Sequence, residues 1–204
     1  MLVLSKAQLV FLAVPKTGTT AVEMELRAQA DIAFSKNRKH ITAQRYHRKV
    51  APFLMDTFGV TPETVAVMRA PTDQLRSWYK YRTAASQKRR ERSTAGMTFD
   101  AFVEAVISPN PPDFANVGSQ WNFLTNASGE VLVDHLFAYS AQPVFLEFLS
   151  NRLGREVTLK QKNVSPETPA PLSDQMADHL RAARREEFDL YDKLTANGGY
   201  LGLA

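Results

Sequence analysis

The sequence predicts an α/β fold in which helices flank a parallel β-sheet, formed by one domain that spans residues 1–204. Two apolar runs, Val10–Val14 and Thr64–Met68, have the unbroken hydrophobicity of strands that are buried on both faces of a parallel sheet. A proline follows each run within three residues, and a helical pattern begins soon after it. No internal repeat and no linker divides the chain, which is long enough to bury a large core.

The first run leads into a loop, Pro15-Lys16-Thr17-Gly18-Thr19-Thr20, and then into a helix expected over Thr19–Ala30. Proline ends the strand and glycine allows a tight turn, so the helix begins directly at the loop. Its first N–H groups, the hydroxyl groups of the three threonines and the ammonium group of Lys16 are then expected to surround a phosphate. The alternative is an ordinary strand-to-helix turn with an exposed lysine.

The spacing of this loop differs from that of common ATP-binding loops. A Walker A loop needs two glycines with the lysine after the second, whereas Lys16 precedes the single glycine, Gly18. A small-molecule kinase that uses ATP would also need a carboxylate for Mg²⁺ at a strand end. Because neither Val14 nor Met68 is followed by one, the sequence disfavours a kinase.

The second apolar run ends at Arg69, and Ser77 follows eight residues later. A helix capped by Thr72 or Asp73 would place Ser77 in its second turn. Ligands bind at the carboxyl ends of strands in open α/β sheets, and a guanidinium group beside a hydroxyl group suits a phosphate. The alternative is an arginine that covers the sheet edge and a serine that faces the core.

Local patterns predict the other elements. We expect a strand at Asp31–Phe34, a helix at Ala43–Phe58 with Thr42 as its cap and Gly59 as its end, a helix that starts after Thr98, a strand at Val131–Tyr139, a helix at Val144–Leu153 followed by Gly154, and a final helix at Ser173–Leu194. Trp78, Tyr79 and Tyr81 follow helical spacing, so we expect them mostly in the core. Gln87–Ser93 is expected on the surface and Leu159–Ser165 to be irregular.

Composition limits the chemistry. The chain has no cysteine, and its four histidines lack the spacing of a zinc site, so we expect no disulfide and no metal. It has no apolar run near the length of about 18 residues that spans a bilayer and no cleavable leader, so we expect a cytoplasmic protein without a membrane span.

The charge is distributed unevenly. Residues 1–100 have 17 Lys and Arg against 8 Asp and Glu, whereas residues 101–204 have 8 against 13. The half with the predicted phosphate loop is therefore basic, as expected for a site that holds a polyanion. Nucleic acid is not an expected partner, because no base-reading motif is present.

The two predicted phosphate sites resemble those of sulfotransferases that use 3′-phosphoadenosine 5′-phosphosulfate (PAPS). Pro15–Thr20 resembles their 5′-phosphosulfate loop, and Val67–Tyr79, with Arg69 and Ser77, resembles their 3′-phosphate motif. Weaker similarity to the Golgi-type carbohydrate sulfotransferases and their bacterial relatives extends over Lys39–Ala43, Thr98–Val103, Gln120–Leu124 and Lys162–Ser165. Two positions depart from the family: Ala70 replaces the usual Asn or Asp, and Tyr139 lies where a Glu is frequent.

The resemblance implies a P-loop-like sulfotransferase fold and in-line, metal-free transfer of a sulfuryl group from PAPS to a hydroxyl group or an amine. The acceptor would be a carbohydrate or a small molecule, and no motif identifies it. The residues that would bind PAPS are Lys16, Thr17, Gly18, Thr19, Thr20, Arg69 and Ser77. Lys16 would also stabilise the leaving phosphate, and His40 would be the general base.

Alternatives remain at three points. His47 is the other candidate base, but it would lie about 10 Å further along the helix that starts near Thr42. A non-catalytic module that binds a nucleotide or a glycan would keep Lys16 and Arg69 and would need no base. The basic run that contains Arg76, Lys80, Arg82, Lys88, Arg89, Arg90 and Arg92 either attracts an anionic acceptor or is a solvated face.

Overall fold

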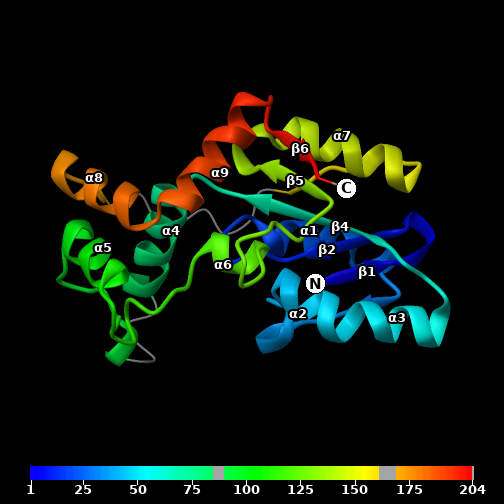
Figure 1. The fold of residues 1–204 in the computed structure, drawn as a ribbon, viewed down its shortest axis with the longest axis horizontal. Helices are drawn as coiled ribbons and strands as arrows, with labels where there is room; N and C mark the ends of the chain where they lie inside the picture. The colour runs from blue at the N-terminus through cyan, green and yellow to red at the C-terminus, as the bar shows by residue number, and fades with distance from the viewer. Residues whose placement is uncertain (85–89, 161–168, 204) are drawn as a thin grey trace.

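A six-stranded mixed sheet with helices on both faces organises the chain (Figure 1). The computed structural model describes residues 1–84, 90–160 and 169–203. The strand order is β3-β1-β2-β4-β5-β6, and the α/β class expected from the sequence is confirmed. None of the helices in the described ranges combines the length and the apolar character that crossing a membrane requires.

The centre of the sheet is parallel. β2 (Leu9–Leu12) pairs in parallel with β4 (Glu63–Met68), which in turn pairs in parallel with β5 (His135–Ala138). In β4 every residue after Glu63 is buried, which explains why this strand is an unbroken apolar run rather than an alternating one. The segments that follow these three strands therefore leave the sheet at the same edge.

The expectation of a wholly parallel sheet is wrong at both sides of this centre. β1 (Leu2–Leu4) pairs antiparallel with β2 through the short turn η1 (Ser5–Ala7), and β6 (Tyr200–Gly202) pairs antiparallel with β5. The few residues between β1 and β2 can join only antiparallel strands, because a parallel pair needs a longer crossover. β3 (Ile32–Ala33) pairs antiparallel with β1 and so runs in the direction of β2.

Two apolar clusters cover the two faces of the sheet. One includes side chains of α2 (Ala43–Arg45), α3 (Ala51–Phe58), α6 (Gln120–Leu124) and α9 (Arg185–Ala196), and the other includes those of α1 (Thr19–Leu26) and α7 (Gln142–Leu153). Alternate residues of β2 contribute to each, with Val10 and Leu12 in the first and Leu9 and Phe11 in the second. The central strands are thus buried on both sides.

A third apolar cluster lies beside the sheet. It joins α4 (Pro71–Ala84), α5 (Phe99–Ile107) and α8 (Asp174–Ala183), which form the helical group at the left of Figure 1. α4 leads directly out of β4 through Arg69 and Ala70, so this group is attached to the edge at which the parallel strands end. Helix α4 begins at Pro71 and is not capped by Thr72 or Asp73 as predicted, because proline is well suited to the first helical position.

Most predicted helix ends are confirmed, but two predicted helices are divided. Thr42, Thr98 and Ser173 accept hydrogen bonds from the first turns of their helices, and Gly59 and Gly154 end theirs in the left-handed conformation. The long helix after Thr42 contains a π-helical turn, η4 (Tyr46–Val50), just before Pro52, which lacks the N–H for a helical bond. The last helix breaks at Arg184 (φ −126°, ψ 38°) into α8 and α9.

Several boundaries also differ from expectation. α1 ends at Leu26 and continues as the 3₁₀ turn η2 (Arg27–Gln29), α7 begins at Gln142, and β5 occupies only part of the predicted Val131–Tyr139. Other 3₁₀ turns are η3 (Lys36–Arg38), η6 (Arg90–Arg92) and η7 (Tyr139–Ala141). The predictions for Gln87–Ser93 and Leu159–Ser165, and the resemblance at Lys162–Ser165, fall wholly or partly outside the described residues.

Candidate anion-binding site

The loop between β2 and α1 is a tight turn with an uncapped helix start. Lys16 (φ 68°) and Gly18 (φ 74°) both adopt the left-handed conformation, which is uncommon for a residue other than glycine. The Thr17 hydroxyl group donates a hydrogen bond of 2.9 Å to the carbonyl oxygen of Val14, and its side chain is buried. Gly18 precedes the first turn of α1 and offers no side-chain cap, so this helix N-terminus can accept an anion.

Lys16 is held between other cations and two aromatic rings. Its Nζ lies 3.8 Å from the centroid of the Tyr81 ring and 5.1 Å from that of Trp78, both on α4. Burial is the main reason that the pKa of Lys16 falls from 10.5 to about 8, and the charges of Arg69, Arg82 and Lys39 contribute to this decrease. A cation that is disfavoured by its surroundings in this way has an environment suited to an anionic ligand.

The sequence predicts that the aromatic residues of α4 lie mostly in the core, and the structure differs from this prediction at Tyr81. Tyr79 is buried against Phe99 and Phe102, and Trp78 is half-buried. Tyr81, by contrast, is 55 % exposed and lies over the Lys16 ammonium group. Helical spacing alone did not reveal that this face of α4 turns toward the loop.

Arg69 lies where the sequence predicted, at the carboxyl end of β4 and next to the β2 loop. Its guanidinium carbon is 4.8 Å from the centroid of the Tyr139 ring, which follows β5. Since β2 and β4 are neighbouring parallel strands, Lys16 and Arg69 lie at the same edge of the sheet, and the charge of Arg69 contributes to the lowered pKa of Lys16. Ser77 is half-buried in the second turn of α4, also as predicted.

A buried glutamine fixes the peptide groups of Arg69. Gln120 accepts a hydrogen bond of 2.8 Å from the Arg69 N–H and donates one of 2.8 Å to the Arg69 carbonyl oxygen. Glu187 in turn accepts bonds from the backbone N–H of Gln120, at 3.3 Å, and from its side-chain amide, at 3.1 Å. Both side chains are almost completely buried, and burial raises the pKa of Glu187 while the nearby charge of Arg184 opposes that rise.

This clamp was missed by sequence reasoning. In the sequence, Gln120 is notable only for its resemblance to a family segment, and nothing local links it to a strand end 51 residues earlier. Gln120 and Glu187 need partners because they are buried, and since burial is a property of the fold, no signal in the sequence identifies this clamp.

His40 lies next to the strand that leads into the loop. Its Nδ1 is 2.7 Å from the carbonyl oxygen of Ala13, and a carbonyl can only accept, so Nδ1 carries a proton and Nε2 has the free lone pair in the neutral ring. Partial burial lowers the pKa of His40 below 6.5, although the bond to Ala13 opposes this shift. The ring is therefore neutral at pH 7 and retains exposed surface.

His47 lies in a different environment. It is exposed on the π-helical turn η4, and its Nε2 is 2.9 Å from the carbonyl oxygen of Leu132. The contacts of His40 are with the segment before the loop, whereas those of His47 are with the chain that precedes β5. The two histidines thus do not share one site.

Lys39 links the helix N-terminus to the His40 segment. Its Nζ is 3.5 Å from the Thr20 hydroxyl oxygen and 3.6 Å from a carboxylate oxygen of Glu23. Thr20 is exposed, whereas Thr19 is buried, so of the predicted threonines only Thr20 presents its side chain openly at the start of α1.

A cavity of about 130 Å³ adjoins the loop. Its lining includes Gly18, Val67, Tyr139, Phe145 and Lys160, so it lies between α1, the ends of β4 and β5, and α7. A Cβ atom on Gly18 would lie 3.0 Å from Cε2 of Tyr139, which shows how closely this ring approaches the loop. A larger cavity of about 320 Å³ lies between residues 106–122 and 183–187, and none of the loop residues lines it.

The basic run that follows Arg69 is engaged in part with the protein itself. Arg82 is buried and donates to the carbonyl oxygens of Asp113 and Asn116. Arg76 pairs with Asp73 and donates a bond of 3.1 Å to the carbonyl oxygen of Ala170. These two arginines are therefore neither part of a solvated face nor available to attract an anionic acceptor substrate. Lys88 and Arg89 fall outside the described residues.

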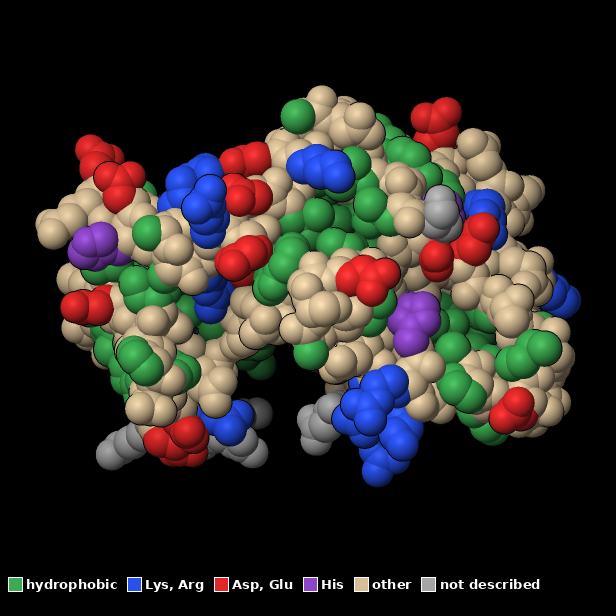
Figure 2. Space-filling view, viewed as in Figure 1, with side chains coloured by type: hydrophobic (Ala, Val, Ile, Leu, Met, Phe, Trp, Pro, Cys, Tyr) green, Lys and Arg blue, Asp and Glu red, His purple; other side chains and the backbone are tan. Residues whose placement is uncertain are grey.

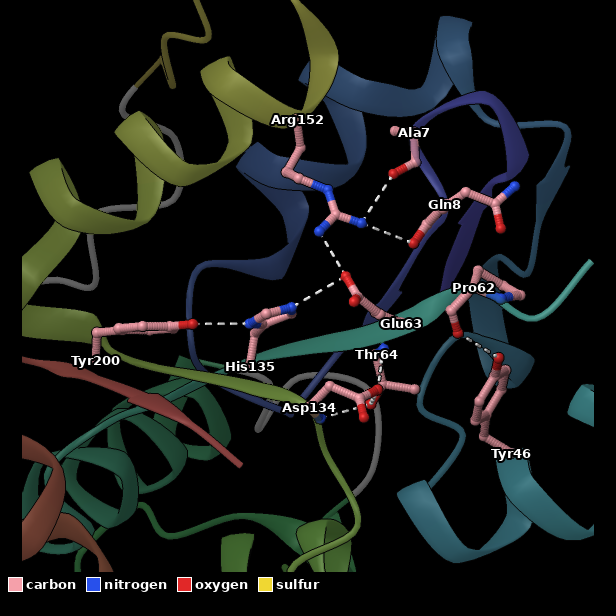
Figure 3. A network of polar contacts seen from close by, with 10 residues as sticks. All are labelled: Ala7, Gln8, Tyr46, Pro62, Glu63, Thr64, Asp134, His135, Arg152 and Tyr200. Atoms are coloured by element: carbon pink, nitrogen blue, oxygen red, sulfur yellow. Dashed lines mark hydrogen bonds and ion pairs between the residues drawn. The ribbon is translucent and has the colours of Figure 1, made fainter. Parts of the chain in front are cut away.

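A second polar cluster lies at the opposite end of the strands (Figure 3). Glu63, at the start of β4, pairs with Arg152 and lies 3.2 Å from Nε2 of His135, whose Nδ1 is 2.9 Å from the Tyr200 hydroxyl group. Its members contact one another across β4, β5, β6 and α7, so we assign this cluster to sheet stability. Among the described residues, no group of three or more His, Asp or Glu side chains is arranged to hold a metal ion.

No protein-family model, curated protein or solved structure matches the chain. The site is therefore interpreted from its own residues and from the motifs in the sequence.

Proposed function

We propose that the protein is a PAPS-dependent sulfotransferase with a P-loop-like fold, which transfers a sulfuryl group to a hydroxyl group or an amine of a carbohydrate or small-molecule acceptor. The observation that carries this proposal is the position of Lys16 and Arg69 at the ends of adjacent parallel strands, where burial and, to a smaller extent, the charge of Arg69 lower the pKa of Lys16. Two phosphate groups on one ligand would offset both charges, and the 5′ and 3′ groups of PAPS meet this requirement.

The chain offers suitable partners for both groups. The first-turn N–H groups of α1, Lys16 and the hydroxyl group of Thr20 would hold the 5′-phosphosulfate. Thr17 and Thr19 are buried, and the Thr17 hydroxyl proton is used by Val14, so we assign their side chains to the shape of the loop. Arg69, with Ser77, would hold the 3′-phosphate, and the Gln120 clamp fixes the backbone from which the guanidinium group extends.

When bound, PAPS supplies the sulfuryl group, whose bond to the acceptor forms as its bond to the 5′-phosphate breaks. The Lys16 ammonium group stabilises the negative charge that develops on the phosphate side, and this requires its protonated form. The free Nε2 lone pair of His40 accepts the acceptor proton, since Nδ1 donates to Ala13 and the lowered pKa keeps the ring neutral. Positioning and charge are the main contributions of the protein, as in phosphoryl transfer.

Calorimetric titration with 3′-phosphoadenosine 5′-phosphate (PAP), adenosine 5′-phosphate and ATP tests this proposal. We expect PAP to bind more tightly than adenosine 5′-phosphate, without a need for Mg²⁺. Transfer of label from labelled PAPS to a panel of acceptors then tests the reaction. Tighter binding of ATP with Mg²⁺ than of PAP would instead indicate a kinase, and PAP binding without transfer to any acceptor would indicate a binding module.

A further inference from the structure

A strongly basic surface lies on the segment before α3. Between residues 36 and 49 the chain has six Lys and Arg and no Asp or Glu. Lys39 pairs with Glu23, but the other five are exposed. These five, which we call the basic cluster, are Lys36, Arg38, Arg45, Arg48 and Lys49, and none of them forms an ion pair within the described ranges of the chain.

An apolar patch follows directly on α3. Phe53, Met55 and Phe58 are 48 %, 52 % and 57 % exposed, and the two phenylalanine rings pack edge to face with centroids 5.7 Å apart. Leu54 is the buried residue of this helix, so α3 attaches to the sheet through a narrow contact and leaves its larger side chains in water. We call Phe53, Met55 and Phe58 the α3 patch.

The basic cluster and the α3 patch share one face of the molecule. Figure 2 shows basic side chains gathered over α2 and, next to them, hydrophobic side chains over α3. The side chains of the α3 patch are exposed to water rather than packed in the core, and a contiguous exposed apolar patch on a folded protein commonly marks an interaction site. The surface therefore combines exposed aromatic and thioether side chains with five cations that form no ion pair with the described residues, and the exposed Asp56 of α3 is its single acidic side chain between residues 36 and 58.

We propose that this surface docks on an anionic lipid bilayer, with the α3 patch at the level of the headgroups and acyl chains and the basic cluster on the lipid charges. The cations select an anionic partner by charge complementarity, and the exposed apolar side chains distinguish a bilayer from a soluble polyanion, which needs charge alone. Membrane-surface helices combine these two features. The proposal does not depend on the sulfotransferase assignment, because none of these eight residues belongs to the proposed PAPS site.

Co-sedimentation of the purified full chain with lipid vesicles tests this inference. We expect binding to vesicles of equal parts phosphatidylcholine and phosphatidylserine, a decrease with added salt, and no binding to phosphatidylcholine alone. R48E/K49E should lower the vesicle affinity by roughly 25-fold or more, since each surface cation contributes about five-fold. F53S/F58S should lower it by roughly ten-fold or more, because two exposed rings no longer enter the bilayer.

Matched variants on other surfaces serve as controls. R185E/K193E makes the same change in net charge at exposed positions of α9, and M24S removes an apolar side chain that is 53 % exposed on α1, on the opposite face of the sheet. Both controls should change the vesicle affinity by less than about three-fold, because neither alters the basic cluster or the α3 patch and salt screens the charges that R185E/K193E introduces over about 10 Å. Unchanged circular dichroism would confirm that each variant is folded.

Three results would overturn the proposal. The first is the absence of binding to the anionic vesicles at low salt. The second is unchanged vesicle binding by F53S/F58S, together with competition by a soluble polyanion such as heparin, which would identify a polyanion site. The third is a dimer in solution that F53S/F58S converts to a monomer, because the α3 patch would then be covered by a second copy of the chain.

Discussion

Replacing Gln120 by methionine is expected to damage both the fold and the proposed 3′-phosphate site. Methionine has a similar length and an unbranched, flexible side chain, so it fills much of the same space but offers neither the carbonyl oxygen nor the amide N–H groups. The Arg69 N–H and carbonyl oxygen then lose partners at 2.8 Å, and Glu187 loses its bond of 3.1 Å from the side-chain amide. Three polar groups behind the site are affected by one substitution.

The magnitude follows from these contacts. A buried polar group left without a partner costs about 1–3 kcal/mol. Arg69 itself is only half-buried, so water can reach part of its backbone, and Glu187 keeps its bond from the Gln120 N–H. We therefore expect Q120M to lower the free energy of unfolding by about 2–4 kcal/mol, a substantial part of the 5–15 kcal/mol that is typical of a domain.

Urea unfolding and calorimetric titration measure the two effects separately. The urea midpoint should fall by about 1 M or more. At a temperature where the variant is folded, the Kd for PAP should rise by roughly ten-fold, whereas that for adenosine 5′-phosphate should change little, because a displaced Arg69 weakens only the 3′-phosphate contact. Q175M, at an exposed position of α8, is the matched control and should resemble the wild type. A Q120M protein with wild-type stability and PAP affinity would refute the role of the clamp.

Four further predictions concern the site. Lys16→Ala should reduce turnover by about 10²-fold or more with a smaller loss of PAP affinity, as measured by steady-state kinetics and titration, and unaltered turnover would remove Lys16 from the reaction. Arg69→Ala should weaken PAP binding by about 1.5–3 kcal/mol and spare adenosine 5′-phosphate; equal losses would show that Arg69 does not contact the 3′-phosphate. His40→Ala should lower turnover and abolish the acidic limb of the pH–rate profile, while His47→Ala should leave both unchanged; the reverse result would identify His47 as the base. Between pH 8 and 10.5, Lys16 is protonated in the unfolded chain but has lost this proton in the ligand-free folded protein. Its contribution to the free energy of unfolding therefore increases as pH rises through that range. Urea unfolding measured at several pH values should show this increase in the wild type, and it should be absent in Lys16→Met.

The parts of the site that depend on neighbours in sequence could be predicted. A buried apolar run, a proline and a glycine define the loop at Lys16, and a second run places Arg69 at the same edge of a parallel sheet. Helix starts could also be predicted from capping residues such as Thr42 and Thr98, because the hydrogen bond of a cap joins residues only three apart in the sequence.

The features that could not be predicted depend on contacts between distant segments. The antiparallel strands β1 and β6 are three residues long, and a strand of that length has no pattern of its own. The Gln120 clamp and the approach of Tyr81 to Lys16 depend on how α4 and α6 pack against the edge of the sheet. Arg184, where the last helix breaks, is a good helix former, and its contacts there include an ion pair with Glu187 and a bond of 3.0 Å to the carbonyl oxygen of the distant Gly118.

The mutual repulsion of Lys16 and its neighbouring cations also has a practical consequence for the choice of buffer. A tetrahedral oxyanion that enters the loop reduces this repulsion and accepts hydrogen bonds from the start of α1, and by mass action it stabilises the folded protein in proportion to the logarithm of its concentration. Phosphate and sulfate ions would therefore raise the melting temperature while they compete with the nucleotide. Affinities measured in phosphate buffer would be too weak, and chloride salts at constant ionic strength are the appropriate medium for every titration described above.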